Sequence, residues 1–259
     1  MVAPDAGTMS QSSFDVTTES GRETGTTLVV GQTHPGLAGV TAADYLVRHL
    51  DATRAGRVST DALPAIAPFE AGVPRHHSRL YTLDDAPLSV LVGELFVPVG
   101  AARSYADALL SWAETEGIDE IAVLHGVPFA HGPDEHAVFH VATEAYRERR
   151  LPDDVFHPLA NGFLDGVAGE LVTRGLDGDA PDVGVYVTPT HPPGPDVDAS
   201  LRLLTALETV HDFDVDESEL EALNEQLREY YGKLAERVAS AAEGEEGLGG
   251  YDTQDGMYM

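Results

Sequence analysis

The stretch from Thr26 to Leu50, TTLVVGQTHPGLAGVTAADYLVRHL, is the most informative part of this sequence for the fold class. Residues 26–31 form a β-branched run that ends in glycine, which is typical of a buried strand. After a short loop, apolar side chains recur at helical spacing, at Leu37, Val40, Ala43, Val47 and Leu50. We therefore expect a strand, a loop and a helix in that order, which is the repeating unit of an α/β fold.

Strand and helix patterns alternate along most of the chain. Further strands are expected at RLYTL (79–83), LSVLVGEL (88–95), IDEIAVLHG (118–126), around 138–141, at VFHPL (155–159) and at DVGVYVT (182–188). Helices are expected at AARSYADALLSWAETEG (101–117), NGFLDGVAGELVTRG (161–175) and DASLRLLTALETV (198–210). This alternation predicts a three-layer α/β/α sandwich with a mixed, mostly parallel sheet, whose antiparallel part is the hairpin of residues 79–95.

The chain is divided by composition into four parts. Residues 1–25 are polar and are expected to be disordered, whereas residues 26–215 have the pattern of a single α/β core domain. Residues 216–242 are predicted to form a C-terminal amphipathic helix. Residues 243–259, rich in glycine and acidic side chains, are predicted to be a flexible tail.

The predicted C-terminal helix has a capping-box start and one apolar face. Ser218 and Glu221 have the spacing of a capping box. The apolar positions recur at steps of three and four residues, at Leu220, Leu223, Leu227, Tyr230, Leu234 and Val238. Such a stripe either packs on its own domain or forms a contact between subunits, and the sequence is compatible with both.

The charge balance is strongly acidic. Fifteen Lys and Arg residues stand against 44 Asp and Glu residues, which gives a net charge of −29, and Lys233 is the one lysine. This balance disfavours sequence-independent nucleic-acid binding, because that binding requires cations to neutralise phosphates. The acidic residues indicate either a binder of basic partners or, as we favour, the surface of a halophilic protein.

The sequence lacks the residues for cysteine-based sites and the segments that would direct the protein into or across a membrane. There are no cysteines, so disulfides and thiolate metal sites are excluded. No apolar run is long enough to cross a membrane, and the first residues do not have the pattern of a secretory signal. We therefore expect a cytoplasmic protein that does not bind a membrane.

Two loops at predicted strand ends are candidates for binding a small ligand. Gly36 and Gly39 lie in GQTHPGLAG, and His125 and His131 lie in LHGVPFAHGPDEH. The glycines either bring a helix N-terminus to an anion or allow close packing of helix on sheet. The histidines are either acid–base groups or ordinary loop residues. We expect no catalytic constellation, no cofactor and no metal site; in particular, a strand around residue 138 would hold His136 and His140 too far apart to share an ion.

The order of several segments resembles the proteasome assembly chaperone 2 family in its archaeal branch. The segments are GQTHPGLAGVTAADYLVRHL (31–50), SYADALLSWAETEGIDEIAVLHG (104–126), and LANGFLDGVAGELVTRG (159–175) followed by DVDASLRLLTAL (196–207). The resemblance extends from about Thr27 to Val215. It implies a fold similar to nucleoside phosphorylases and a non-enzymatic protein that binds the proteasome core particle as an assembly chaperone or an ATP-independent activator. We also expect a homo-oligomer. One departure is Gln32-Thr33-His34, where relatives usually have a large apolar residue near the proline.

The resemblance also gives a role to the last three residues, Met257, Tyr258 and Met259. Proteins that dock on the outer α ring of the proteasome often end in a hydrophobic residue, tyrosine and any residue, and this terminus matches that pattern. A free carboxylate, an aromatic ring with a hydroxyl donor and a soft apolar side chain suit such a pocket. The alternative hypothesis is an enzyme, or a nucleoside- or anion-binding protein, that acts through the loops of Gly36, Gly39, His125 and His131.

Overall fold

The computed structural model describes residues 14–19, 24–84, 86–129, 131–132, 135–151, 156–178, 180–191 and 194–246. These residues form two compact units, which divide between Asp216 and Glu217. The first unit contains the sheets and five of the helices, and the second contains the last helix.

The first unit is built on one nine-stranded mixed sheet. Its strands, in spatial order, are β1 (Phe14–Thr18), β3 (Ala52–Thr60), β6 (Ser78–Leu83), β7 (Leu88–Gly93), β2 (Thr27–Gln32), β8 (Glu120–Val127), β11 (Asp182–Pro189), β9 (Phe139–Ala142) and β10 (His157–Pro158). The central strands β7, β2, β8 and β11 are parallel to one another, and antiparallel pairs flank them on both sides. A separate antiparallel pair consists of β4 (Phe69–Glu70) and β5 (Val73–Pro74).

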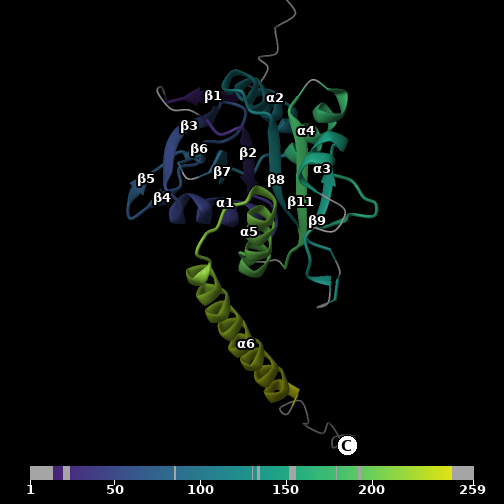
Figure 1. The fold of residues 1–259 in the computed structure, drawn as a ribbon. Coiled ribbons are helices and arrows are strands. Elements are labelled where there is room, and N and C mark those ends of the chain that lie inside the picture. The colour runs from purple at the N-terminus through teal and green to yellow at the C-terminus, as the bar shows by residue number, and fades with distance from the viewer. Residues whose placement is uncertain are drawn as a thin grey trace, which may run out of the picture. The chain divides into compact units, whose positions relative to one another are not determined.

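Helices cover both faces of this sheet (Figure 1). They are α1 (Ala38–His49), α2 (Val99–Glu116), α3 (Glu144–Arg150), α4 (Gly166–Asp177) and α5 (Val197–His211). Helices α1 and α5 contact each other and the centre of the sheet, while α2 and α4 contact each other and, with β11, belong to the main apolar core. The predicted three-layer α/β sandwich with a mixed sheet is confirmed.

The strands at the centre are buried on both faces, which explains their continuous apolar sequences. In β8, Ile121 and Val123 belong to the core under α2 and α4. The alternate residues, Ala122 and Leu124, point to the opposite face, where Gly39 of α1 lies against the Leu124 carbonyl. Because alternate residues are buried on both faces, a short continuous apolar run is typical of a central strand.

The prediction that residues 1–25 are disordered is wrong for Phe14–Thr18, which form β1 and pair with β3. The physical reason is a short alternating pattern. Phe14 is buried and its ring lies 5.1 Å from that of Tyr105, while the neighbouring Asp15 is exposed. At the other end of β1, the Trp112 indole donates a hydrogen bond of 2.9 Å to the Thr18 hydroxyl.

The described element of the second unit is the helix α6 (Ser218–Glu246), which has 29 residues and begins two residues after the predicted start at residue 216. It ends at Glu246, so residues 243–246 continue the helix and do not belong to the predicted tail. Along its apolar stripe, Leu223 is 44% exposed, Tyr230 61% and Leu234 43%.

Candidate functional site

The carboxyl ends of β2, β8 and β11 lie side by side at one edge of the sheet, because these strands are neighbours and parallel. Three connections leave the ends of these strands: residues 33–37 before α1, residues 128–138 before β9, and residues 190–196 before α5. In open α/β sheets this is the edge at which ligands bind. Both loops predicted from the sequence as ligand loops are here.

The glycines of the first loop are used for close packing. Gly36 has a φ of 83°, and a Cβ atom at this position would lie 2.6 Å from the Thr190 Cβ. A Cβ atom on Gly39 would lie 2.2 Å from the carbonyl oxygen of Leu124 in β8. The loop is also held by backbone hydrogen bonds, such as the 2.8 Å bond that the Asp196 amide donates to the Gly36 carbonyl. Of the two interpretations from the sequence, the structure supports the packing role of these glycines.

His125 is buried at the end of β8, beside His34 of the first loop. The two imidazole centroids are 4.5 Å apart, and the Nδ1 atom of His125 is buried without a hydrogen-bond partner among the described residues. Burial, with a smaller contribution from His34, lowers the pKa of His125 to about 3. Burial also lowers the pKa of His34. This pair is therefore neutral near pH 7 and is poorly suited to donate a proton.

His131 lies in a different cluster, so the structure does not bring the two predicted loop histidines together. The His131 ring contacts those of His136 and His191, with centroid distances of 4.9 and 4.7 Å. The His136 and His191 centroids are 5.1 Å apart. One ring nitrogen from each of the three side chains lies within 4.8 Å of the others, a spacing close to that of a metal-binding site.

From the sequence, both His136 and His140 are predicted to lie in a strand around residue 138, but the structure places only His140 in a strand. His140 lies in β9, opposite Tyr186 of β11, whereas His136 precedes the strand. The cluster of three histidines joins residues from two loops, and only His131 of the three was singled out as a site residue. The spacing in the sequence holds no signal for the contact with His191, because that contact depends on β8 and β11 being neighbours.

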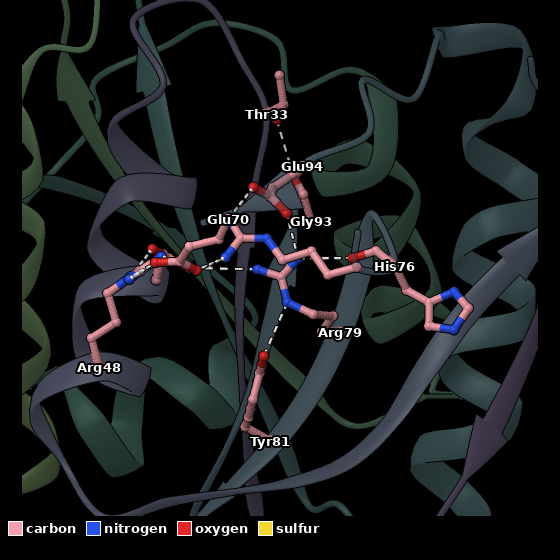
Figure 2. A network of polar contacts seen from close by, with 10 residues as sticks. Thr33, Arg48, Glu70, His76, Arg79, Tyr81, Gly93 and Glu94 are labelled. Atoms are coloured by element: carbon pink, nitrogen blue, oxygen red, sulfur yellow. Dashed lines mark hydrogen bonds and ion pairs between the residues drawn. The ribbon is translucent and has the colours of Figure 1, made fainter. Parts of the chain in front are cut away.

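A network of charged side chains lies at the same edge of the sheet, near the ends of β2 and β7 (Figure 2). At its centre, Arg79 of β6 forms an ion pair with Glu94 and donates a 3.0 Å hydrogen bond to the Tyr81 hydroxyl. The side chain of Arg79 is only 3% exposed. Burial would lower the pKa of Arg79, but the bonds to Glu94 and Tyr81 outweigh it and raise the pKa above its ordinary value.

Further ion pairs connect this centre to α1 and to the β4–β5 hairpin. Arg75 contacts Glu70 at 2.5 Å and Glu94 at 2.8 Å. Arg48 of α1 contacts Glu70 at 2.6 Å. Asp44 receives contacts from Arg48 and Arg79. Because three arginines are balanced by three carboxylates, the network ties elements of the fold together and has no surplus charge to attract a substrate.

Two clefts lie outside the predicted loops. A cleft of about 700 Å³ between α2 and α4 opens at the amino ends of β8 and β11, with Asp107, Glu114, Asp119 and Arg174 in its wall. A more apolar cleft of about 390 Å³ is lined by residues of β9 and α4 and by the exposed Phe163. Neither cleft is lined by the four predicted loop residues.

The tail residues Met257, Tyr258 and Met259 lie outside the described residues. Within the described part of the chain, every helix is too short or too polar to cross a membrane.

Several solved structures share this fold. A Pyrococcus furiosus protein described as PbaA, an archaeal homolog of proteasome-assembly chaperone, is 18% identical, with a TM-score of 0.77 over 91% of this chain and 97% of that one. P. furiosus PbaB, described as an archaeal proteasome activator, is 18% identical, with a TM-score of 0.73 over 86% and 99% of the two chains. A Thermoplasma acidophilum protein of unknown function is 23% identical, with a TM-score of 0.69 over 85% and 90%.

None of the curated proteins matches the chain significantly in sequence. The model of the PAC2 family, in contrast, matches residues 28–235, which include nearly all of the α/β unit and much of α6. Since this match covers well over half of the sequence, the chain belongs to the PAC2 family.

Proposed function

We propose that this protein binds the proteasome core particle, as an assembly chaperone or as an ATP-independent activator, and that it is not an enzyme. The observation that carries this proposal is the family match over residues 28–235. It is supported by the similarity of the fold to two structures, one described as a homolog of proteasome-assembly chaperone and the other as a proteasome activator. The cytoplasm, where a core particle would be met, is the proposed location.

The proposed docking element is the C-terminal tripeptide of Met257, Tyr258 and Met259, which would bind the outer α ring. Tyr258 offers a rigid aromatic ring and a hydroxyl donor, and ordering it costs little side-chain entropy. Met257 offers an adaptable apolar contact. The terminal carboxylate can pair with a cation in the pocket.

We propose that the protein is a homo-oligomer and that α6 forms the contact between its copies. A helix of 29 residues is roughly 43 Å long. Its apolar stripe has the steps of three and four residues that pack helices against each other, and Leu223, Tyr230 and Leu234 in that stripe are 43–61% exposed in the single chain. Several tails on one oligomer would bind a ring more tightly than one tail by raising the effective concentration.

The alternative hypothesis of a small-molecule function has less support. It requires space at Gly36 and Gly39, but Thr190 and the Leu124 carbonyl approach these glycines so closely that a Cβ atom would not fit. It also uses His125, whose low pKa is unsuited to acid–base work near neutral pH.

The proposal is tested with purified full-length protein and purified core particle in molar KCl. Co-sedimentation of the two proteins is the expected result. Hydrolysis of a fluorogenic peptide by the mature core particle separates the two roles, because an activator increases the rate and an assembly chaperone does not. An absence of binding both to the mature particle and to its isolated α subunits would refute the proposed function.

A further inference from the structure

The cluster of His131, His136 and His191 is the one group of described residues with the geometry of a metal site. His131 and His136 lie in the loop after β8, and His191 lies in the loop after β11. One ring nitrogen from each lies within 4.8 Å of the others. Imidazoles are good ligands for Zn²⁺ and similar divalent ions, and three of them leave a fourth position for water.

The Nδ1 atoms of His131 and His191 have oxygen partners at hydrogen-bond distance. The Nδ1 atom of His131 lies 2.7 Å from the Phe129 carbonyl oxygen, and that of His191 lies 2.8 Å from Oδ2 of Asp196. For His136, Nδ1 lies 3.8 Å from Oδ2 of Asp198. In His131 and His191 the oxygen acceptor at Nδ1 places the proton there, so Nε2 carries the free lone pair that a metal needs, whereas the 3.8 Å contact of His136 is beyond hydrogen-bond distance.

The Nε2 atom of His131 supplies an independent observation. It is buried and has no hydrogen-bond partner among the described residues. Buried polar atoms are nearly always paired, so an orphan nitrogen among two other imidazoles calls for a partner. A metal ion bound by all three rings would be that partner.

The carboxylates of Asp196 and Asp198, which lie beside the rings of His191 and His136, are themselves fixed by other contacts. Asp196 is buried, and its Oδ1 atom accepts the amide of Ala199 at 2.9 Å, which caps α5. Its Oδ2 atom accepts both the amide and the ring nitrogen of His191, each at 2.8 Å. Asp198 forms an ion pair with Arg202, which also donates to the Thr188 hydroxyl at 2.9 Å. Carboxylates fixed behind metal-binding histidines orient the rings and make them better ligands.

We propose that His131, His136 and His191 bind one divalent transition-metal ion, with Zn²⁺ as the best match, and that this ion joins the loop after β8 to the loop after β11. The oxygen-preferring ions Mg²⁺ and Ca²⁺ do not match three imidazoles. In a tetrahedral site with Zn–N bonds of about 2.05 Å, the ligand nitrogens are about 3.3 Å apart. The rings therefore close by somewhat more than an ångström on binding, and His136 and His191, both exposed, have room to turn. This proposal differs from the expectation, drawn from the sequence, that the protein has no metal site.

The test uses untagged full-length protein, stripped of metal with a chelator and dialysed into molar KCl. Zn²⁺ is titrated by competition with a chromophoric chelator in the presence of millimolar Mg²⁺, which occupies acidic surface sites without competing for imidazole. Co²⁺ is titrated separately, because its visible absorption reports nitrogen ligands directly. We expect one equivalent of Zn²⁺ per chain and a visible spectrum of tetrahedral Co²⁺.

Four variants identify the site. His136→Ala and His191→Ala change exposed side chains, and each is expected to weaken Zn²⁺ binding more than 100-fold. Asp196→Asn keeps the cap of α5 and is expected to weaken binding about 10- to 100-fold, as is usual when a carboxylate behind a histidine ligand is lost. His157→Ala, at an exposed histidine outside the cluster, is the matched control and should bind as wild type does.

Thermal unfolding links these measurements to the fold. Zn²⁺ should raise the midpoint temperature of unfolding of the wild type and of His157→Ala. It should not change the midpoint temperatures of His136→Ala and His191→Ala, because only a bound ion stabilises the native state. Without metal, all variants at exposed histidines should unfold at similar temperatures. Weak wild-type binding that the cluster substitutions do not alter, or no imidazole signature with Co²⁺, would overturn the proposal.

Discussion

Gly39→Ala is expected to destabilise the protein, although alanine is the better helix former. Gly39 lies in the first turn of α1, and a Cβ atom there would be 2.2 Å from the Leu124 carbonyl oxygen and 3.0 Å from its carbon. These are backbone atoms of a central strand, so α1 has to move away from β8 by about 1 Å to restore ordinary contacts. Overpacking of this kind costs roughly 1–3 kcal/mol. The gain in helix propensity, at most about 1 kcal/mol, does not offset it.

The matched control is Gly100→Ala in the first turn of α2. No atom lies within 4 Å of a Cβ built on Gly100, so alanine there should be neutral or stabilising by up to about 1 kcal/mol. Urea unfolding in constant molar KCl measures both free energies of unfolding. If Gly39→Ala were as stable as the wild type, α1 would not be packed on β8 as described, and the argument that Gly39 has a packing role would fail.

Four further predictions follow from the charges and the terminus. Because burial lowers the pKa of His125 to about 3 and that of His211 to about 4, the unfolded chain binds more protons below pH 6.5. Each histidine should therefore remove about 1.4 kcal/mol of stability per pH unit as the pH falls from 6.5 toward those values, as measured by urea unfolding between pH 7 and pH 5. Arg79→Ala should cost about 1–3 kcal/mol, since it removes a buried donor to the Tyr81 hydroxyl and the His76 carbonyl, while Glu94 keeps its ion pair with Arg75; a loss below 1 kcal/mol would contradict this. With a net charge of −29, the melting temperature should fall as KCl is diluted from 1 M to 0.1 M, because the screening length grows from about 3 Å to about 10 Å. In molar KCl, Tyr258→Ala should weaken core-particle binding more than amidation of the terminal carboxylate does, since salt screens the charge and favours apolar burial; the reverse order would contradict the apolar account of the terminus.

Local patterns were sufficient to predict the centre of the fold. Strands β2, β8 and β11 are short continuous apolar runs, helices α1, α2 and α5 have an apolar period of about 3.6 residues, and each lies where the sequence indicated. The strand β3 gave no such signal. Its sequence ATRAGRVST has few apolar residues, and a bulge between Arg54 and Gly56 breaks the alternation. Its partner β1 is short, and its burial depends on contacts with Tyr105 and Trp112, far along the chain.

The same distinction between local and distant contacts applies to the candidate sites. Both interpretations of Gly39 were compatible with the sequence, and choosing between them required the position of the Leu124 carbonyl. The network around Arg79 joins residues 15 and 35 positions away in the sequence, at Glu94 and Asp44, so no local pattern predicts it. The histidine cluster depends on the order of the strands in the sheet, which brings His191 beside the loop after β8.

The most direct test of the account is the dissociation constant for the core particle, measured by analytical co-sedimentation in molar KCl with and without residues 257–259. The matched control is Tyr251→Ala, which removes the other tyrosine of the same tail. We expect the truncated protein to lose binding by at least 100-fold, with unchanged thermal unfolding, and the Tyr251→Ala variant to bind as the full-length protein does. Equal binding by the truncated and full-length proteins would contradict docking through the C-terminal tripeptide.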